Sequence, residues 1–311
     1  MDGLPRPSMA ALLDQWSVQP VALAAAVAVT SWYVYAARRQ GEWPVRRTVA
    51  FAIGIALLVW TTCGFPQAYS GSLYWVWTAQ TLALLLAIPV VLMAGRPLDL
   101  AQGSPGPRAV AERVLRSRPG RALRNPLVGP LLVLVLSVVL FFGPLPGWDS
   151  AVPPLGWVVQ VVLVVVGALI ALPLIGGSSA AGSLVVGLAL AVGMVELILD
   201  AIPGMVLRLQ THPATSYFTD RLTHRWSPSA LHDQQLAGAI LWGVAEMIDI
   251  PFLALVFLAW VRADRSEAAQ VDAVLDAERA ARVALGETDG PGQTDSPWWL
   301  TDPALRDRFR H

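Results

Sequence analysis

The sequence predicts an all-α fold: a polytopic integral membrane bundle of seven transmembrane helices, with its N-terminus outside and its C-terminus in the cytoplasm. Three observations lead to this prediction. Hydrophobic residues make up 55% of the 311 residues and charged residues only 14%, whereas soluble globular domains carry about 25% charged residues. Seven stretches are long and apolar enough to cross a bilayer. Arginines gather in the loops on one side of these stretches. The low charged fraction also argues against a disordered or nucleic-acid-binding protein.

The seven predicted spans follow from length and hydropathy. A helix needs about 20 mostly apolar residues to cross a hydrocarbon core of about 30 Å, because each residue adds about 1.5 Å. The stretches that meet this length are 18–37, 48–67, 72–94, 126–146, 153–175, 180–203 and 236–261. The fourth and fifth are rich in Val and Leu, but their length favours helices over strands, since lipid leaves backbone groups no other partner. The first is not a cleaved signal peptide, because its basic residues follow it.

The placement of arginines predicts the orientation. The loops assigned to the cytoplasm carry Arg38, Arg39, Arg46, Arg47, Arg96, Arg108, Arg113, Arg116, Arg118, Arg121 and Arg124, and Arg262 and Arg265 follow the last span. The opposite loops carry only Arg6, Arg208, Arg221 and Arg225. By the positive-inside rule the N-terminus lies outside, which agrees with an odd number of spans.

The sequence divides into a membrane domain, 1–262, and a cytoplasmic tail, 263–311. A Pro/Gly/Arg-rich cytoplasmic loop within the first part is expected to be helical over 109–123. The tail begins as an amphipathic helix with an apolar stripe and, after a Gly/Pro break, ends near Trp298 and Trp299. It is expected either to lie against the membrane or a partner through these residues, or to be a solvated helix with a disordered end.

Four carboxylates fall inside or at the end of predicted spans. Glu196 and Asp200 lie four residues apart on the sixth span, and Glu246 and Asp249 lie three apart on the seventh, so each pair shares a helix face. A carboxylate near the bilayer centre costs about 2.5–3.5 kcal/mol on insertion scales, so these groups should face the bundle interior, a cavity or a partner. They form either a proton or cation path, or hydrogen bonds between helices.

The residues that could bind a metal are few. The single cysteine excludes an intramolecular disulfide and a Cys-cluster zinc site. Met194 and Met247 offer sulfur to Cu(I), and His232 with Asp233 offers nitrogen and oxygen. A lone histidine in a wet loop is more often solvated than a ligand, and methionine in an apolar span more often packs. No phosphate loop, catalytic triad or dinucleotide fingerprint is suitably placed, so the sequence does not predict an enzyme.

One motif is specific. The stretch 232–242 reads His-Asp-Gln-Gln-Leu-Ala-Gly-Ala-Ile-Leu-Trp and resembles the cytochrome c oxidase assembly factor family (CtaG-like), in which Asp-Gln-Gln-Leu-Ala-Gly followed by Trp opens the last membrane helix. Further elements agree in order: Trp16 and Pro20; Trp43, Pro44 and Arg47; Pro89, Gly95, Pro97 and Leu98; Asn125 and Pro126; Gly167, Pro173, Leu174, Ile175 and Gly176. The resemblance covers residues 16–262.

This resemblance implies a multi-pass protein of the bacterial plasma membrane that helps to mature a haem–copper oxidase, with oxidase subunits and lipid as partners. In the family, a role in copper delivery depends on histidines in the third and fifth spans. Here the third-span positions are occupied by Trp77 and Thr81, or by Val76 and Gln80 in a register shifted by one; the fifth-span positions are Gly156 and Gln160. None of these residue types replaces imidazole for Cu(I). The chain is therefore expected to be a divergent member, with copper as the only cofactor implied.

Three functions remain open. The first is an assembly factor for a cytochrome c oxidase that acts mainly as a scaffold. The second is a copper or proton permease that uses the carboxylates of the sixth and seventh spans. The third is an accessory subunit of a respiratory complex.

The start of the last span is where these functions would differ. Asp233 is expected to cap that helix, and Gln234 and Gln235 to hydrogen-bond to the sixth span or to the outer ends of the third and fifth. In the alternative interpretation, His232 and Asp233 form the entry to a metal or proton path. The structural interpretation is favoured, because the membrane histidines of a copper path are missing from the sequence.

Overall fold

A computed structural model of the chain describes residues 4–102, 113, 117, 128–143, 145, 153–175, 183–220 and 226–284. Every regular element in these ranges is a helix, so the all-α prediction is confirmed for this part of the chain. Apart from residues 113 and 117, the helix expected over 109–123 lies outside the described residues, as does the end of the tail with Trp298 and Trp299. The chain divides into two compact units, one of residues 1–180 and 187–257 and the other of residues 181–186 and 258–311.

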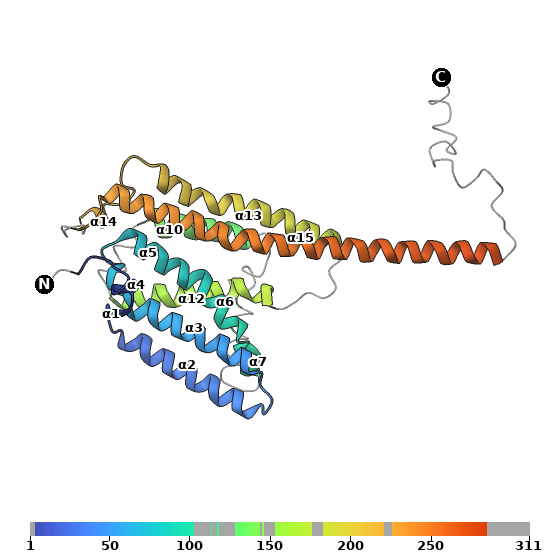
Figure 1. Ribbon diagram of the computed structural model, residues 1–311, viewed down its shortest axis with the longest axis horizontal. Coiled ribbons are helices and arrows are strands. Elements are labelled where there is room, and N and C mark those ends of the chain that lie inside the picture. The colour runs from blue at the N-terminus through green and yellow to red at the C-terminus, as the bar shows by residue number, and fades with distance from the viewer. Residues whose placement is uncertain are drawn as a thin grey trace, which may run out of the picture. The chain divides into compact units, whose positions relative to one another are not determined.

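The helices carry the labels of Figure 1. They are α1 (Ala11–Asp14), α2 (Pro20–Arg39), α3 (Val45–Cys63), α4 (Phe65–Tyr69), α5 (Tyr74–Leu82), the π-helical turn η1 (Ala83–Ala87), α6 (Ile88–Ala94), α7 (Pro97–Gln102), α10 (Val128–Phe142), α12 (Pro153–Ile175), α13 (Ser183–Leu209), α14 (Ser216–Thr219) and α15 (Ala230–Ala284).

A helix lies at each of the seven predicted stretches. Among the described residues, four helical stretches are long and apolar enough to cross a membrane: Pro20–Arg39, Val45–Tyr69, Tyr74–Ala94 and Pro154–Ala171. They correspond to the first, second, third and fifth predicted spans. Helices α2, α3, α6 and α12 pack in succession, since α2 contacts α3, α3 contacts α6, and α6 contacts α12.

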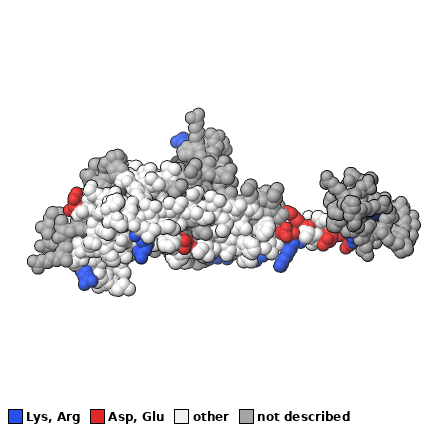
Figure 2. Space-filling model, turned by 90° about the horizontal axis from the view of Figure 1, so that it is seen from above, with Lys and Arg blue, Asp and Glu red and all other residues white. Residues whose placement is uncertain are grey.

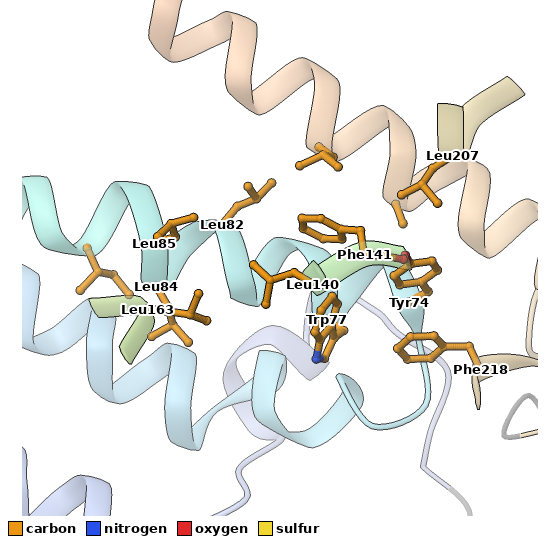
Figure 3. Close-up of a cluster of buried hydrophobic side chains, with 13 residues drawn as sticks. Tyr74, Trp77, Leu82, Leu84, Leu85, Leu140, Phe141, Leu163, Leu207 and Phe218 are labelled. Carbon is orange, nitrogen blue, oxygen red and sulfur yellow. The ribbon is translucent and has the colours of Figure 1, made fainter. Parts of the chain in front are cut away.

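The principal core of the first unit gathers around the start of α5 (Figure 3). The ring of Tyr74 stacks on Phe218 of α14 with their centroids 4.6 Å apart. Trp77, one turn further along α5, meets Phe141 of α10 edge-on at 5.5 Å. The hydroxyl group of Tyr74 donates a hydrogen bond to the carbonyl of Phe141. This core holds the first turn of α5 against segments that are far away in the sequence.

The outward faces of the helices in the first unit are apolar. Val27 on α2, Val161 on α12 and Ile198 on α13 are more than 60% exposed, although large aliphatic side chains in a water-soluble protein are mostly buried. In the space-filling view, the described part of this unit shows few charged side chains (Figure 2). These surfaces suit contact with lipid.

The predicted boundary at residue 262 lies inside α15, which continues without a break to Ala284. Beyond Val261 this helix carries both acidic and basic side chains (Figure 2). The apolar stripe of the predicted amphipathic helix is exposed, with Val271 and Val274 at 58% and Leu275 at 42%. Two ion pairs of this segment join neighbouring turns of the helix, Arg279 with Asp276 at 3.1 Å and Arg282 with Glu278 at 4.0 Å.

Candidate functional site

The start of α15 is capped by a residue that the sequence analysis missed. The hydroxyl oxygen of Ser229 accepts a hydrogen bond from the backbone N–H of His232 at 3.2 Å, the usual contact between a cap residue and the third helical residue. The N–H of Asp233 already donates to the carbonyl of Ser229 at 2.9 Å. The prediction that Asp233 caps its own helix is therefore wrong, because α15 begins earlier and Ser229 takes that place.

Asp233 instead caps α5. Its Oδ2 atom accepts a hydrogen bond from the N–H of Tyr74 at 2.7 Å, and its Oδ1 atom accepts one from the N–H of Trp75 at 3.2 Å. These are the first two residues of α5, and the residue before them, Leu73, has no side-chain acceptor to offer. The carboxylate therefore supplies both the missing acceptor and a negative charge at the positive end of the α5 dipole.

The surroundings of Asp233 shift the pKa of its carboxyl group in opposite directions. The side chain is 0% exposed. This burial raises the pKa of the Asp233 carboxyl, while the hydrogen bonds from Tyr74 and Trp75 and the neighbouring His232 lower it, and burial has the larger effect. Both oxygens are engaged by backbone donors, so a metal ion at this carboxylate would have to displace bonds that hold α5.

Gln234 performs the complementary task for α13. Its side chain is 1% exposed, and its Nε2 atom lies 3.2 Å from the carbonyl of Leu207 in the last turn of that helix. The same atom lies 3.1 Å from Oε1 of Gln210 and 3.4 Å from the carbonyl of His212, so three acceptors share two hydrogens. Its Oε1 atom accepts from the N–H of Ala214 at 2.6 Å. One amide thus closes the C-terminal end of α13 and fixes the loop after it.

The same turn of α15 also approaches α13 at backbone distance. A methyl group on Gly238 would lie 2.7 Å from the N atom of Arg208 and 2.7 Å from the carbonyl oxygen of Gly204. A methyl group on Gly204 would lie 2.6 Å from the N atom of Trp242. The carbonyl of Gln235 accepts a hydrogen bond from the guanidinium group of Arg208 at 3.2 Å. Small residues at 204 and 238 therefore permit the contact that brings Gln234 to the end of α13.

A second polar cluster lies between α4, α5 and α12. The Oε1 atom of Gln67 accepts from Nε2 of Gln80 and from Nε2 of Gln160, each at 2.8 Å, and Gln80 also donates to the carbonyl of Thr61 at 3.0 Å. Gln80 and Gln160 are two of the positions where the family resemblance expected histidines, so these positions do meet in space. Trp77, the residue of the other register, is buried in the core beside Phe141 instead.

The side chains of this amide cluster are not the ligands that copper prefers. Cu(I) prefers thiolate, thioether and imidazole ligands, whereas the cluster consists of three amides bonded to one another and to a backbone carbonyl. Among the described residues, no group of three or more His, Cys, Asp and Glu side chains is placed to hold a metal ion. The amides can hold helices together, and each one that is replaced would leave others without partners.

The remaining candidates are scattered or outside the described part. Met194 on α13 and Met247 on α15 are exposed, at 48% and 69%, as expected for side chains in contact with lipid. Glu246 accepts a hydrogen bond from the indole N–H of Trp242, one turn earlier on the same helix. The backbones of Glu196 and Asp200 lie in α13 and that of Asp249 in α15, but their side chains lie outside the described part, so the proposed path through them stays a prediction.

Comparison with known proteins supports the resemblance. The family model described as "Cytochrome c oxidase caa3 assembly factor (Caa3_CtaG)" matches residues 29–263. "Uncharacterized protein Mb0105" of Mycobacterium bovis and "Uncharacterized protein MT0111" of Mycobacterium tuberculosis are each 28% identical over 295 residues, which cover 88% of this chain and 43% of the relative. "Uncharacterized protein ML1998" of Mycobacterium leprae is 26% identical over 294 residues, 88% of this chain and 44% of the relative. The chain thus spans less than half the length of these relatives. No solved structure matches it.

Proposed function

Because the chain belongs to the cytochrome c oxidase caa3 assembly factor family, we propose that it is a membrane-embedded factor that assists the assembly of a haem–copper cytochrome c oxidase and acts mainly as a scaffold. In this proposal seven helices cross the bacterial plasma membrane, the N-terminus lies outside, and residues 263–311 lie in the cytoplasm. Its partners are the lipid bilayer and subunits of the oxidase, and it catalyses no reaction itself.

The observation that carries the scaffold role is the amide cluster of Gln67, Gln80 and Gln160. A protein that passes copper through the membrane needs soft ligands that exchange their metal. This chain has amides at two of the positions where such ligands are expected, Gln80 and Gln160, and Gln67 bonds both of them at 2.8 Å. The cluster joins α4, α5 and α12 and thereby supports a fixed arrangement of helices.

The cap residues at the start of α15 support the same role. Asp233 and Gln234 are both buried and both use their polar atoms to hold other helices. Residues of a transport path would instead have to exchange partners with the cargo. A fixed outer end of the bundle is what a scaffold offers to a partner subunit.

Membrane insertion is supported by four helical stretches of the described residues that are long and apolar enough to cross a bilayer, and by the exposed aliphatic side chains on their outer faces. The proposed orientation is supported by the arginines at the end of α2, Arg38 and Arg39, and at the start of α3, Arg46 and Arg47.

The test is deletion of the gene in its own bacterium, followed by reduced-minus-oxidised spectra of the membranes. We expect the signal of haem–copper oxidase to fall and to return when the full chain is supplied. A tagged chain should co-purify with oxidase subunits. Liposomes that contain the purified chain should show no copper-dependent or pH-dependent flux. Normal oxidase spectra after deletion would refute the assembly role, and copper or proton flux would refute the scaffold role.

A further inference from the structure

Helix α2 carries a groove on its outward face. The groove has a volume of about 340 Å³ and is lined by Thr30, Ser31, Val34, Tyr35 and Arg38. These residues follow one another along a single stripe of the helix, with hydroxyl groups two turns before Arg38. Of the four apolar stretches, Pro20–Arg39 is the least buried, at 22%. The groove therefore opens toward whatever surrounds the bundle.

Two arginines lie at one end of this groove. Arg38 lines it, and the guanidinium group of Arg39 lies over the ring of Tyr35, 5.2 Å from the ring centroid. Among the described residues, neither arginine forms an ion pair, whereas Arg47 and Arg96 share Asp99 at 3.9 and 3.5 Å. Two cations thus stand at the mouth of the groove without a described counter-ion.

The groups that line the groove suit one kind of molecule. Guanidinium groups bind phosphate through paired hydrogen bonds. The hydroxyl groups of Tyr35 and Ser31 line the same groove one and two turns before Arg38, and they can donate hydrogen bonds to the oxygens of a phospholipid. Val34 and the exposed Val27 provide an apolar surface for an acyl chain. Arginines close to the cytoplasmic membrane surface attract anionic lipids, each by about 1 kcal/mol.

We infer that the groove of α2 binds an anionic phospholipid, with its phosphate at Arg38 and Arg39 and one acyl chain along Val34. The inference rests on the proposed membrane insertion, and it names a partner that the family membership does not supply. The bound lipid covers the least buried of the four described apolar stretches and neutralises the charge at its end.

The experiment uses the full chain, purified in detergent and supplied with equal amounts of phosphatidylglycerol and phosphatidylcholine, with native mass spectrometry to count bound lipids. We expect a preference for phosphatidylglycerol. Substitution R38Q/R39Q should lower this preference about 30-fold, since each arginine at a membrane surface contributes about 1 kcal/mol toward anionic lipid and about 1.4 kcal/mol is a factor of ten. The matched control R279Q/R282Q removes the same charge from α15, at arginines that lie well beyond the predicted span and pair with Asp276 and Glu278. Because the attraction of arginine to anionic lipid falls off within a Debye length of the membrane surface, this control should change the preference less than about threefold.

A second variant keeps every arginine. Val34→Trp fills the groove and should reduce the retention of phosphatidylglycerol without changing the net charge. Equal binding of the two lipids by the unmodified chain would overturn the inference, and so would equal losses in R38Q/R39Q and in the control. If R38Q/R39Q loses a co-purifying protein while its lipid ratio is unchanged, the occupant is a protein segment and the inference is wrong. Recovery of the chain outside the membrane fraction would refute the proposed function itself, before lipid is tested.

Discussion

Removal of the Asp233 carboxylate should destabilise the bundle far more than removal of an exposed acid. Asp233→Ala leaves the N–H groups of Tyr74 and Trp75 buried without an acceptor, at a site that is 0% exposed. Loss of an N-cap costs about 0.5–2 kcal/mol, and a buried donor without a partner costs about 1–3 kcal/mol. Since the two estimates overlap in part, we expect a loss of about 2–4 kcal/mol in the free energy of unfolding.

The free energy of unfolding of Asp233→Asn should lie between those of the unmodified chain and Asp233→Ala. Its amide oxygen can keep the shorter bond, from the N–H of Tyr74, but its NH₂ group then faces the N–H of Trp75, where two donors meet. One bond is lost rather than two, so the expected loss is about 1–2 kcal/mol. The stabilities should therefore rank in the order Asp, Asn, Ala.

The assay is thermal unfolding of the purified full chain in detergent, together with the level of the protein in membranes. Asp220→Ala is the control, because Asp220 is an exposed acid at the end of α14, and surface substitutions usually stay within about 0.5 kcal/mol. Equal stability of Asp233→Ala and Asp220→Ala would refute the cross-helix cap. If Asp233→Asn leaves the protein abundant and stable yet abolishes oxidase maturation, the carboxylate serves function directly and the structural interpretation is wrong.

Three further predictions concern the same corner. Gln234→Ala should cost about 1–3 kcal/mol, because it leaves the buried carbonyl of Leu207 and the half-buried N–H of Ala214 without the partner that Gln234 supplies. Gln235→Ala should stay within about 0.5 kcal/mol, because the contact of Gln235 uses its backbone carbonyl. Urea unfolding compares the two variants, and equal losses would contradict the role of the Gln234 amide. Gly238→Ala should lower the free energy of unfolding by about 1–3 kcal/mol or more, because the added methyl group overpacks against backbone atoms. On the same helix, a methyl group at Gly243 meets nothing within 4 Å, so Gly243→Ala should be neutral or raise the free energy of unfolding by up to about 1 kcal/mol. Burial raises the pKa of Asp233, so the folded chain holds a proton there at pH values where the unfolded chain has lost it. The free energy of unfolding should therefore fall as the pH rises above the ordinary value of about 3.9. A pH series of melting temperatures should show this fall in the unmodified chain and not in Asp233→Asn.

The helices could be predicted from the sequence because their signal is local. Length and hydropathy alone place a helix at each of the seven stretches, and α2 runs from Pro20 to Arg39 where the span 18–37 was predicted. A helix was also expected at the start of the tail, and α15 covers it up to Ala284. The continuity of this helix with the last span was not predicted, because hydropathy marks only the part of a helix that contacts lipid and the apolar signal ends where the charged segment begins.

The partners of the site residues could not be predicted because they lie far away in the sequence. Asp233 bonds to Tyr74, 159 residues earlier, and nothing in the motif names that partner. The one local signal that was available is Ser229, which stands three residues before His232 and is a favoured cap residue. For Gln80 and Gln160 the family resemblance supplied the positions, but the residue between them, Gln67, follows no pattern that a single sequence reveals.

The order of the two residues at the start of α15 follows from the helices that meet there. The beginning of α5 presents N–H groups and needs an acceptor, while the end of α13 presents carbonyl groups and needs a donor. An ionised Asp233 can only accept, so it cannot serve the carbonyl groups at the end of α13, whereas the Nε2 group of Gln234 donates to them. Adjacent residues on a helix point about 100° apart, which allows one turn of α15 to serve two neighbours. The Asp-Gln pair therefore has a sufficient physical reason in the packing of three helices, and a transport role is not needed to explain it.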